Sequence, residues 1–167
     1  IAVQRAVGDE LAPQIAEAAA LIGSAIAGGH KLLIFGNGGS AADAQHFAAE
    51  FVGRFLLERS PYAAIALTTD TSALTALAND YGMESMFRRQ LEALARPGDI
   101  ALALSTSGNS ENVLAAVEAA KKIPIHTIGM TGRSGGRLAR AVGLCLAVPS
   151  DSTPRIQEAH GLMIHAI

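Results

Sequence analysis

The chain has 167 residues, of which half are hydrophobic and 17% are charged, and its formal net charge at pH 7 is −2. The absence of a basic run and an aromatic content of only 4% argue against nucleic acid as the main partner. No apolar stretch is long and unbroken enough to cross a bilayer, and the single cysteine, Cys145, excludes an internal disulfide. We therefore expect a cytoplasmic protein without a membrane partner, whose surface suits a small anionic ligand or another protein.

Short apolar runs alternate with helical patterns along the chain. The predicted strands cover residues 32–35, 63–67, 99–104, 124–129 and 144–148. The predicted helices cover residues 10–27, 40–54, 72–78, 83–95, 110–121 and 153–167, and a further helix is expected after 131–136. Because such alternation builds a parallel sheet covered by helices, we predict an α/β fold. It would be a single-domain, three-layer sandwich over residues 1–167, with a five-stranded parallel sheet and an N-terminal helical segment at residues 1–29.

The first predicted strand leads into a glycine-rich turn, Gly36-Asn37-Gly38-Gly39, and then into an alanine-rich helix. Ser40, with Asp43 three residues later, fits a helix N-cap. A helix N-terminus behind such a turn offers backbone N–H groups and a positive dipole end to an anion. The turn is not a P-loop, because no Gly-Lys-Ser/Thr follows, and it lacks the third spaced glycine of a dinucleotide site.

A second loop, Ser105–Ser110, carries four hydroxyl groups between a buried strand and a helix start. Hydroxyl and free backbone N–H groups can bind phosphate without lysine or arginine. The alternative interpretation is a turn with an N-cap, since serine and asparagine are common in both. Two such loops at the carboxyl edge of one parallel sheet favour a phosphorylated ligand. A third loop, residues 131–136, is interpreted as a structural turn.

Two helices carry residue types that bind metals. His46 and Glu50 lie four residues apart, on one face of a helix, and Gln157 and His165 lie eight apart on the last helix with Gly161 between them. Imidazole, carboxylate and amide oxygen together suit a divalent metal such as zinc. From spacing alone, a surface ion pair or a satisfied histidine explains His46 and Glu50 better than a metal site does. His30 and His126 are expected to be structural, and His160 is expected to be structural or interfacial.

These motifs together resemble the phosphoheptose isomerases of the sugar-isomerase (SIS) domain superfamily. The likeness rests on Gly36–Ser40, the His46–Glu50 helix, Asn79-Asp80, Ser105–Ser110 and Arg155–Glu158, and it covers nearly the whole chain in the same order. The resemblance implies a SIS fold and an aldose–ketose isomerase that converts sedoheptulose 7-phosphate into D-glycero-D-manno-heptose 7-phosphate. That reaction would be the first step of ADP- or GDP-heptose biosynthesis for lipopolysaccharide.

The resemblance also implies roles for individual residues. One Zn²⁺ per subunit would be held by His46, Glu50, Gln157 and His165. Glu50 and His165 would be the catalytic acid/base pair, and active sites would be shared between subunits of a homotetramer. The implied substrate contacts are Asn37, Gly38, Gly39, Ser40, Glu50, Arg54, Asn79, Asp80, Ser105, Thr106, Ser107, Ser110 and Gln157. For Arg54 and Asp80, simple structural ion pairs remain an equally good interpretation.

Two alternatives from other functional classes stay open. A non-catalytic SIS-domain protein could bind a bacterial replication initiator, and a SIS domain could serve as a phosphosugar-sensing regulatory domain. The complete set of metal-binding residue types favours the isomerase over both. Relative to the family, a further N-terminal helical segment and a longer last helix are expected, so both termini of the sequence are expected to be incomplete.

Overall fold

The computed structural model describes residues 1–167 and contains one five-stranded sheet. All strands are parallel, in the order β2-β1-β3-β4-β5. They are β1 (Leu32–Gly36), β2 (Ala64–Ala66), β3 (Ile100–Leu104), β4 (His126–Thr131) and β5 (Leu144–Ala147). Gly36 at the end of β1 pairs with Leu104 at the end of β3, so the loops after these two strands start side by side. The predicted α/β class and five-stranded parallel sheet are confirmed.

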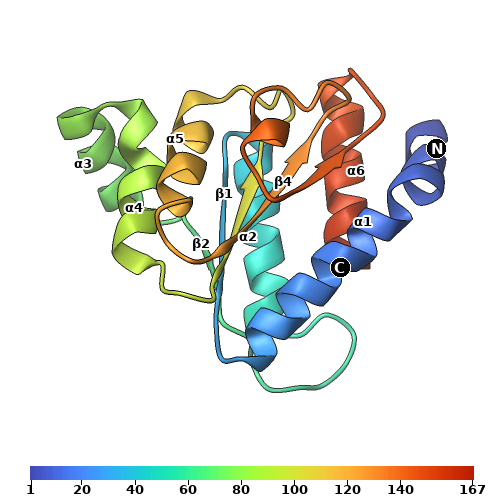
Figure 1. Ribbon diagram of the computed structural model, residues 1–167, viewed down its shortest axis with the longest axis horizontal. Helices are drawn as coiled ribbons and strands as arrows, with labels where there is room; N and C mark the ends of the chain where they lie inside the picture. The colour runs from blue at the N-terminus through green and yellow to red at the C-terminus, as the bar shows by residue number, and fades with distance from the viewer.

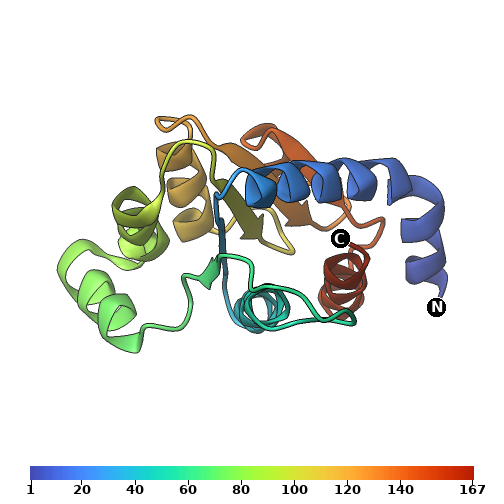
Figure 2. The same ribbon diagram turned by 90° about the horizontal axis from the view of Figure 1, so that it is seen from below.

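Six α-helices cover the two faces of the sheet (Figure 1). Helices α1, α2 and α6 lie on one face, and α3, α4 and α5 on the other, as the view along the layers also shows (Figure 2). The helices are α1 (Ala2–Ala27), α2 (Gly39–Val52), α3 (Thr71–Tyr81), α4 (Met86–Leu94), α5 (Glu111–Ala120) and α6 (Thr153–Ala166), with 3₁₀ turns at Met83–Ser85 and Leu138–Arg140. None of these helices combines the length and the apolar character needed to span a membrane.

Each central strand is buried on both sides, which explains its unbroken apolar sequence. Along β1, Leu32 and Ile34 join the core beneath α1, α2 and α6, whereas Leu33 and Phe35 join the core beneath α4 and α5. This alternation follows the period of two residues in a strand. The two cores fix α2 and α6 on the same face of the sheet.

Two local predictions are wrong. Ser40 is not the N-cap of α2, because Gly38 takes that position with a positive φ of 57°, and the Ser40 side chain is buried in the first helical turn. No α-helix follows residues 131–136, where only the 3₁₀ turn Leu138–Arg140 forms. Gly135 and Gly136 both have positive φ there and pack against the serine loop, so the backbone cannot enter a helix at that point.

Helices α2 and α6 both start at the carboxyl edge of the sheet and run side by side away from it (Figures 1 and 2). Gly39 begins α2 at that edge, and Glu50 lies eleven residues later, about 16 Å along the helix axis. The molecule therefore has a loop end, at the top of Figure 1, and an opposite end where α2 passes into the loop of residues 53–63.

Candidate active site

The glycine loop is joined to the first turn of α5, directly after the serine loop, by a pair of amide side chains. Asn37 Nδ2 donates to Asn112 Oδ1, and Asn112 Nδ2 donates to Asn37 Oδ1, both at 2.8 Å. Asn112 Oδ1 also accepts from the N–H of Val113. The Asn37 side chain thus uses one of its two N–H groups and one oxygen lone pair to hold the two segments together, and the other N–H and lone pair remain for a ligand. Asn112 was not predicted, because an asparagine in the first turn of a helix is ordinary in sequence and acquires meaning only from its partner.

The hydroxyl groups of the serine loop converge in space. Ser105 Oγ lies 3.0 Å from Ser110 Oγ and 3.5 Å from Ser107 Oγ, and the Ser107 hydroxyl also accepts from the N–H of Asn109 at 3.2 Å. Ser105 is buried, with 4% of its surface exposed. Gly108 adopts a positive φ of 65°, and a Cβ there would lie 2.1 Å from the carbonyl oxygen of Gly135, so the turn has no space for a side chain. The loop forms the compact group of hydroxyls that the sequence predicted.

A cavity of about 560 Å³ opens between the two loops. The first turn of α5 forms one wall, so its free N–H groups border the cavity, as in helix N-terminal anion sites. Met83 and Glu84 come from the segment after α3 and were not singled out in the sequence, since nothing local distinguishes them. The lining residues are Asn37, Gly38, Met83, Glu84, Ser110, Glu111 and Asn112.

The backbone of the loop at residues 131–136 packs against the backbone of the serine loop. The N–H of Gly132 donates to the Thr106 carbonyl at 3.0 Å, and the N–H of Arg137 donates to Asn109 Oδ1 at 3.1 Å. A Cβ on Gly132 would lie 2.7 Å from the Thr106 carbonyl oxygen, which shows how closely the two backbones approach. These contacts agree with the interpretation of residues 131–136 as a structural turn.

In the second half of α2, from its midpoint at His46 to its last turn at Glu50, two side chains that can bind a metal lie together with His165 of α6 as the third member. His46 Nε2 is 2.7 Å from His165 Nε2 and 3.6 Å from Glu50 Oε1, and the ligand atoms of all three lie within 4.8 Å of one another. The Asp43 carboxyl lies one helical turn before His46, and burial raises its pKa above the ordinary value, against the opposing effect of His46. The structure thus brings together residues that are 119 positions apart in the sequence, as the metal hypothesis requires.

A cavity of about 240 Å³ lies beside this histidine–carboxylate cluster (His46, Glu50 and His165). The Phe55 ring stacks on the His165 ring, with centroids 5.1 Å apart and planes inclined by 13°. Arg59 and Tyr62, from the same loop, also line the cavity. The sequence did not reveal Phe55 or Arg59, because an aromatic and a basic residue in an irregular loop form no pattern.

Gln157 does not lie in this cluster. Its side-chain amide rests against the backbone of Gly39, where an added Cβ would lie only 2.4 Å from Gln157 Nε2. Gly39 is seven residues before His46 on α2, and Gln157 is eight residues before His165 on α6. Across the two adjacent helices, Gly39 with Gln157 and His46 with His165 therefore form two contacts about two helical turns apart. The structure thus places the predicted substrate contacts Gln157 and Gly39 together at the loop end.

The model of the SIS domain family matches residues 1–132. The phosphoheptose isomerase of Geobacter sulfurreducens is 57% identical over 165 residues, which cover 99% of this chain and 87% of that protein. The chain belongs to the phosphoheptose isomerase family. The solved phosphoheptose isomerase structures from Neisseria gonorrhoeae and Francisella tularensis superpose with TM-scores of 0.94 and 0.95 at 47% and 42% identity, covering 99% of this chain and 89% and 88% of theirs.

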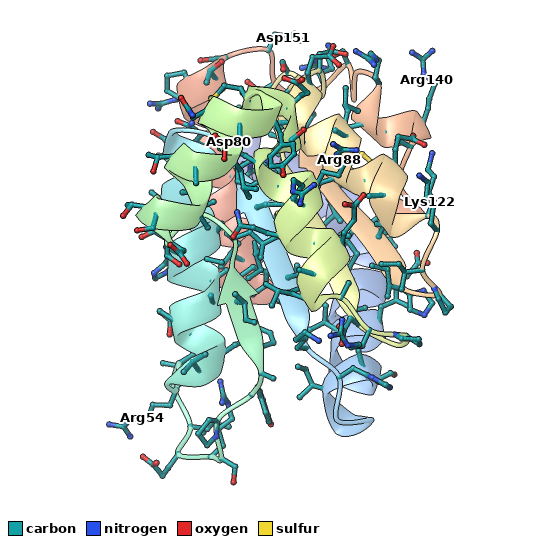
Figure 3. The ribbon with its side chains drawn as sticks, turned by 90° about the vertical axis from the view of Figure 1, so that its left-hand side faces the viewer. Arg54, Asp80, Arg88, Lys122, Arg140 and Asp151 are labelled. Carbon is teal, nitrogen blue, oxygen red and sulfur yellow. The ribbon has the colours of Figure 1, made fainter.

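As a member of this family, the chain is an aldose–ketose isomerase with the SIS fold. The comparisons favour neither the initiator-binding nor the regulatory alternative. The residues that carry the resemblance are expected to serve one reaction. A single copy of this chain, however, does not bring all of them together. Arg54 projects beyond the end of α2, whereas Asp80 lies at the other end of the molecule, on α3 (Figure 3).

Both outlying groups have local partners. Arg54 Nη1 forms an ion pair with Glu58 at 2.9 Å, and 62% of its side chain is exposed. Asn79 Nδ2 donates to Asp80 Oδ1 at 2.7 Å. Within one chain, Arg54 thus forms a structural ion pair, as the alternative interpretation predicted. The hydrogen bond between Asn79 and Asp80 leaves both side chains exposed at the loop end.

The remaining histidines lie outside the cluster. His160 is fully buried on α6, with Nε2 3.2 Å from the Thr131 carbonyl oxygen, and burial lowers its pKa from 6.5 to about 4. Its other ring nitrogen, Nδ1, has no hydrogen-bond partner. His30 packs against Gly98 at the end of α1, and His126 is exposed at the start of β4. A structural role for His160 agrees with this position.

Proposed function

We propose that the chain interconverts sedoheptulose 7-phosphate and D-glycero-D-manno-heptose 7-phosphate. The observation that carries the proposal is the convergence of His46, Glu50 and His165 from two helices, on the chain that also bears a group of serine hydroxyls suited to phosphate. An aldose–ketose isomerase needs both a place for the phosphate and a separate pair of proton-transfer groups. We further place this reaction in the cytoplasm, at the first step of ADP- or GDP-heptose biosynthesis for lipopolysaccharide.

The phosphate would bind at the loop end. Ser105, Ser107 and Ser110 supply hydroxyl donors, and the first turn of α5 supplies backbone N–H groups. Such a site binds an anion without a lysine or arginine side chain, because the N–H dipoles point toward it. Asn37, Gly38, Gly39, Ser40, Thr106 and Gln157 complete the proposed substrate contacts at this end.

We propose one Zn²⁺ per subunit at the histidine–carboxylate cluster. Two imidazoles and one carboxylate match the His₂Glu donor set that catalytic zinc accepts from proteins, with a position left for water or substrate. When bound, the metal would act as a Lewis acid toward the substrate oxygens. Gln157, the fourth ligand implied by the family, rests beside Gly39, which supports its proposed substrate contact more directly than its proposed metal contact.

Glu50 and His165 are the proposed acid/base pair. Glu50 would take the proton from the hydroxyl-bearing carbon next to the carbonyl and return it to the former carbonyl carbon. His165 would give a proton to the carbonyl oxygen and take the hydroxyl proton from the neighbouring oxygen, which becomes the new carbonyl oxygen. Metal ligation lowers the basicity of a carboxylate, so we expect Glu50 to change its metal contact when substrate binds. Arg54, Asn79 and Asp80 would contact the sugar hydroxyl groups.

We also propose a homotetramer whose active sites are shared between subunits. The separation of Arg54 from Asp80 supports this assembly, since contacts from a second copy would be needed to place both near one substrate (Figure 3). Exposed apolar surface on α6, where Leu162 is 42% exposed, is surface that such an assembly would bury.

The direct test is turnover of sedoheptulose 7-phosphate by the purified protein, with zinc measured on the same sample. We expect conversion to the aldose phosphate and about one zinc per chain. Failure to isomerise sedoheptulose 7-phosphate by zinc-loaded protein would overturn the proposed function.

A further inference from the structure

The Arg59 side chain lies against the carbonyl groups at the C-terminal end of α2. Its guanidinium donates from Nη2 to the Glu50 carbonyl at 2.7 Å and from Nη1 to the Phe51 carbonyl at 2.9 Å. The same Nη1 donates to the carbonyls of Ser60 at 3.0 Å and Gly53 at 3.3 Å. One side chain therefore connects the end of a helix to two points of the loop that follows.

These contacts meet a physical need of the helix end. The last carbonyls of an α-helix have no partner within the helix, and its C-terminus carries a partial negative charge. The next N–H in the chain, that of Gly53, reaches only the Ala49 carbonyl, so the Glu50 carbonyl depends on Arg59. A guanidinium is always charged and presents its donors in a rigid plane, which suits several carbonyls at once.

The guanidinium also stacks on an aromatic ring. Arg59 Cζ lies 3.9 Å from the centroid of the Tyr62 ring, and the Tyr62 N–H donates to the Phe51 carbonyl at 3.0 Å. The loop that these contacts fasten carries Phe55 onto the His165 ring. The fastened loop thus forms one wall of the cavity beside Glu50 and His165.

We infer that Arg59 is a positioning residue, which fixes the turn that carries Glu50 and holds the Phe55 loop against His165. Its donors are directed to main-chain oxygens and its plane is stacked on Tyr62, so it acts through Glu50 and not by moving a proton itself. The inference rests on the proposed function, because the consequence of a misplaced Glu50 is a loss of turnover.

Three variants test this role. Arg59→Met keeps an unbranched, flexible apolar stem but removes every donor. Arg59→Lys keeps the charge but loses the planar fork. Arg140→Met is the matched control, because Arg140 is exposed on the 3₁₀ turn after β4 and makes no hydrogen bond or ion pair (Figure 3).

We expect Arg59→Met to lower kcat roughly 10- to 100-fold, the size of effect that displacement of a catalytic group produces. KM for sedoheptulose 7-phosphate should change by less than about threefold, because the loop end is untouched. Arg59→Lys should lie between Met and wild type, and Arg140→Met should match wild type. Chymotrypsin should cut after residues 55–57 roughly ten times faster in Arg59→Met, since cleavage follows the population of the open loop.

Unchanged kcat in Arg59→Met, with or without faster cleavage, would overturn the positioning role. A rise in KM at constant kcat would also overturn it, because Arg59 would then contact the substrate. Should Arg59→Met fail to fold, the same readouts on Arg59→Lys decide. Lack of turnover in the wild type would refute the proposed function alone, and the cleavage rates would still show whether Arg59 holds the loop.

Discussion

The two ends of α2 are built in different ways. At the loop end, short-range hydrogen bonds and glycine backbones form a compact group, with Ser105 buried to 4% exposure. At the other end, the His46 and Glu50 side chains are 47% and 25% exposed, and their contact to His165 joins two separate helices. The first end is suited to hold a charged group in fixed geometry, whereas the second is open to a ligand and depends on long-range packing.

This difference indicates a division of labour. Rigid N–H and hydroxyl donors bind the substrate equally well before and during reaction, so they should govern KM. Groups that accept and release protons should govern kcat. Changes at the two ends should therefore separate in the kinetics.

The largest effect should come from Glu50→Gln. An amide oxygen can still bind a metal but cannot accept a proton from carbon, so kcat should fall about 10²- to 10⁴-fold. Steady-state kinetics with zinc content measured in parallel would check this, with Glu17→Gln on the exposed face of α1 as control. His165→Gln should behave alike. Activity within threefold of wild type in zinc-loaded Glu50→Gln would remove the assigned base.

Asn112→Leu should have the next largest effect. It removes both partners of the Asn37 amide, at a cost of about 1 kcal/mol in the free energy of unfolding, because Asn37 is exposed and water can replace the lost hydrogen bonds. Because the pair joins the glycine loop to the first turn of α5, directly after the serine loop, KM should rise more than kcat falls. Urea unfolding together with kinetics would measure both. A variant with normal stability and normal KM would show that the two loops do not need the amide pair.

His160 predicts a pH dependence of stability. Its pKa is lowered from 6.5 to about 4 by burial, so between those values the unfolded chain binds more protons than the folded one. Stability from this residue is present above pH 6.5 and is lost as the pH falls toward 4, by about 2 kcal/mol between pH 7 and pH 5. Urea unfolding at both values should show this loss in the wild type and a smaller one in His160→Gln. Equal losses in both proteins would contradict the assignment.

The smallest effect should come from single hydroxyl groups. Ser107→Ala and Ser110→Ala should each raise KM roughly tenfold, the loss of one hydrogen bond to a charged group, with kcat nearly constant. Ser24→Ala, exposed on α1, is the control. Competitive inhibition by inorganic phosphate should weaken in parallel. If both variants bound phosphate as the wild type does, the serine loop would not be the phosphate site.

The sequence predicted most accurately what is determined locally. Strand β3 and the serine loop could be located because an unbroken buried run and a cluster of small polar residues each have a characteristic pattern. The cap of α2 was predicted wrongly at Ser40, because glycine at position 38 supplies the turn through its own backbone geometry. Local composition could not show whether α2 begins after Gly38 or after Ser40.

Contacts between distant segments were only partly accessible. The spacing of Gln157 and His165 on α6 could not show which residues of α2 they face. In the structure Gln157 lies against Gly39 and His165 against His46, so the two α6 residues make separate contacts with α2. Arg59 was not predicted because its acceptors are main-chain carbonyls, which every residue has and no sequence pattern marks. Asn112 was missed because its partner Asn37 lies 75 positions away.

The division between the two ends is tested most directly by removing the metal. Wild-type protein treated with a chelator should still bind sedoheptulose 7-phosphate in a calorimetric titration, through the loop end, while its turnover falls at least about a hundredfold and returns on addition of Zn²⁺. Full turnover by the metal-free protein, or loss of phosphosugar binding together with turnover, would contradict the account.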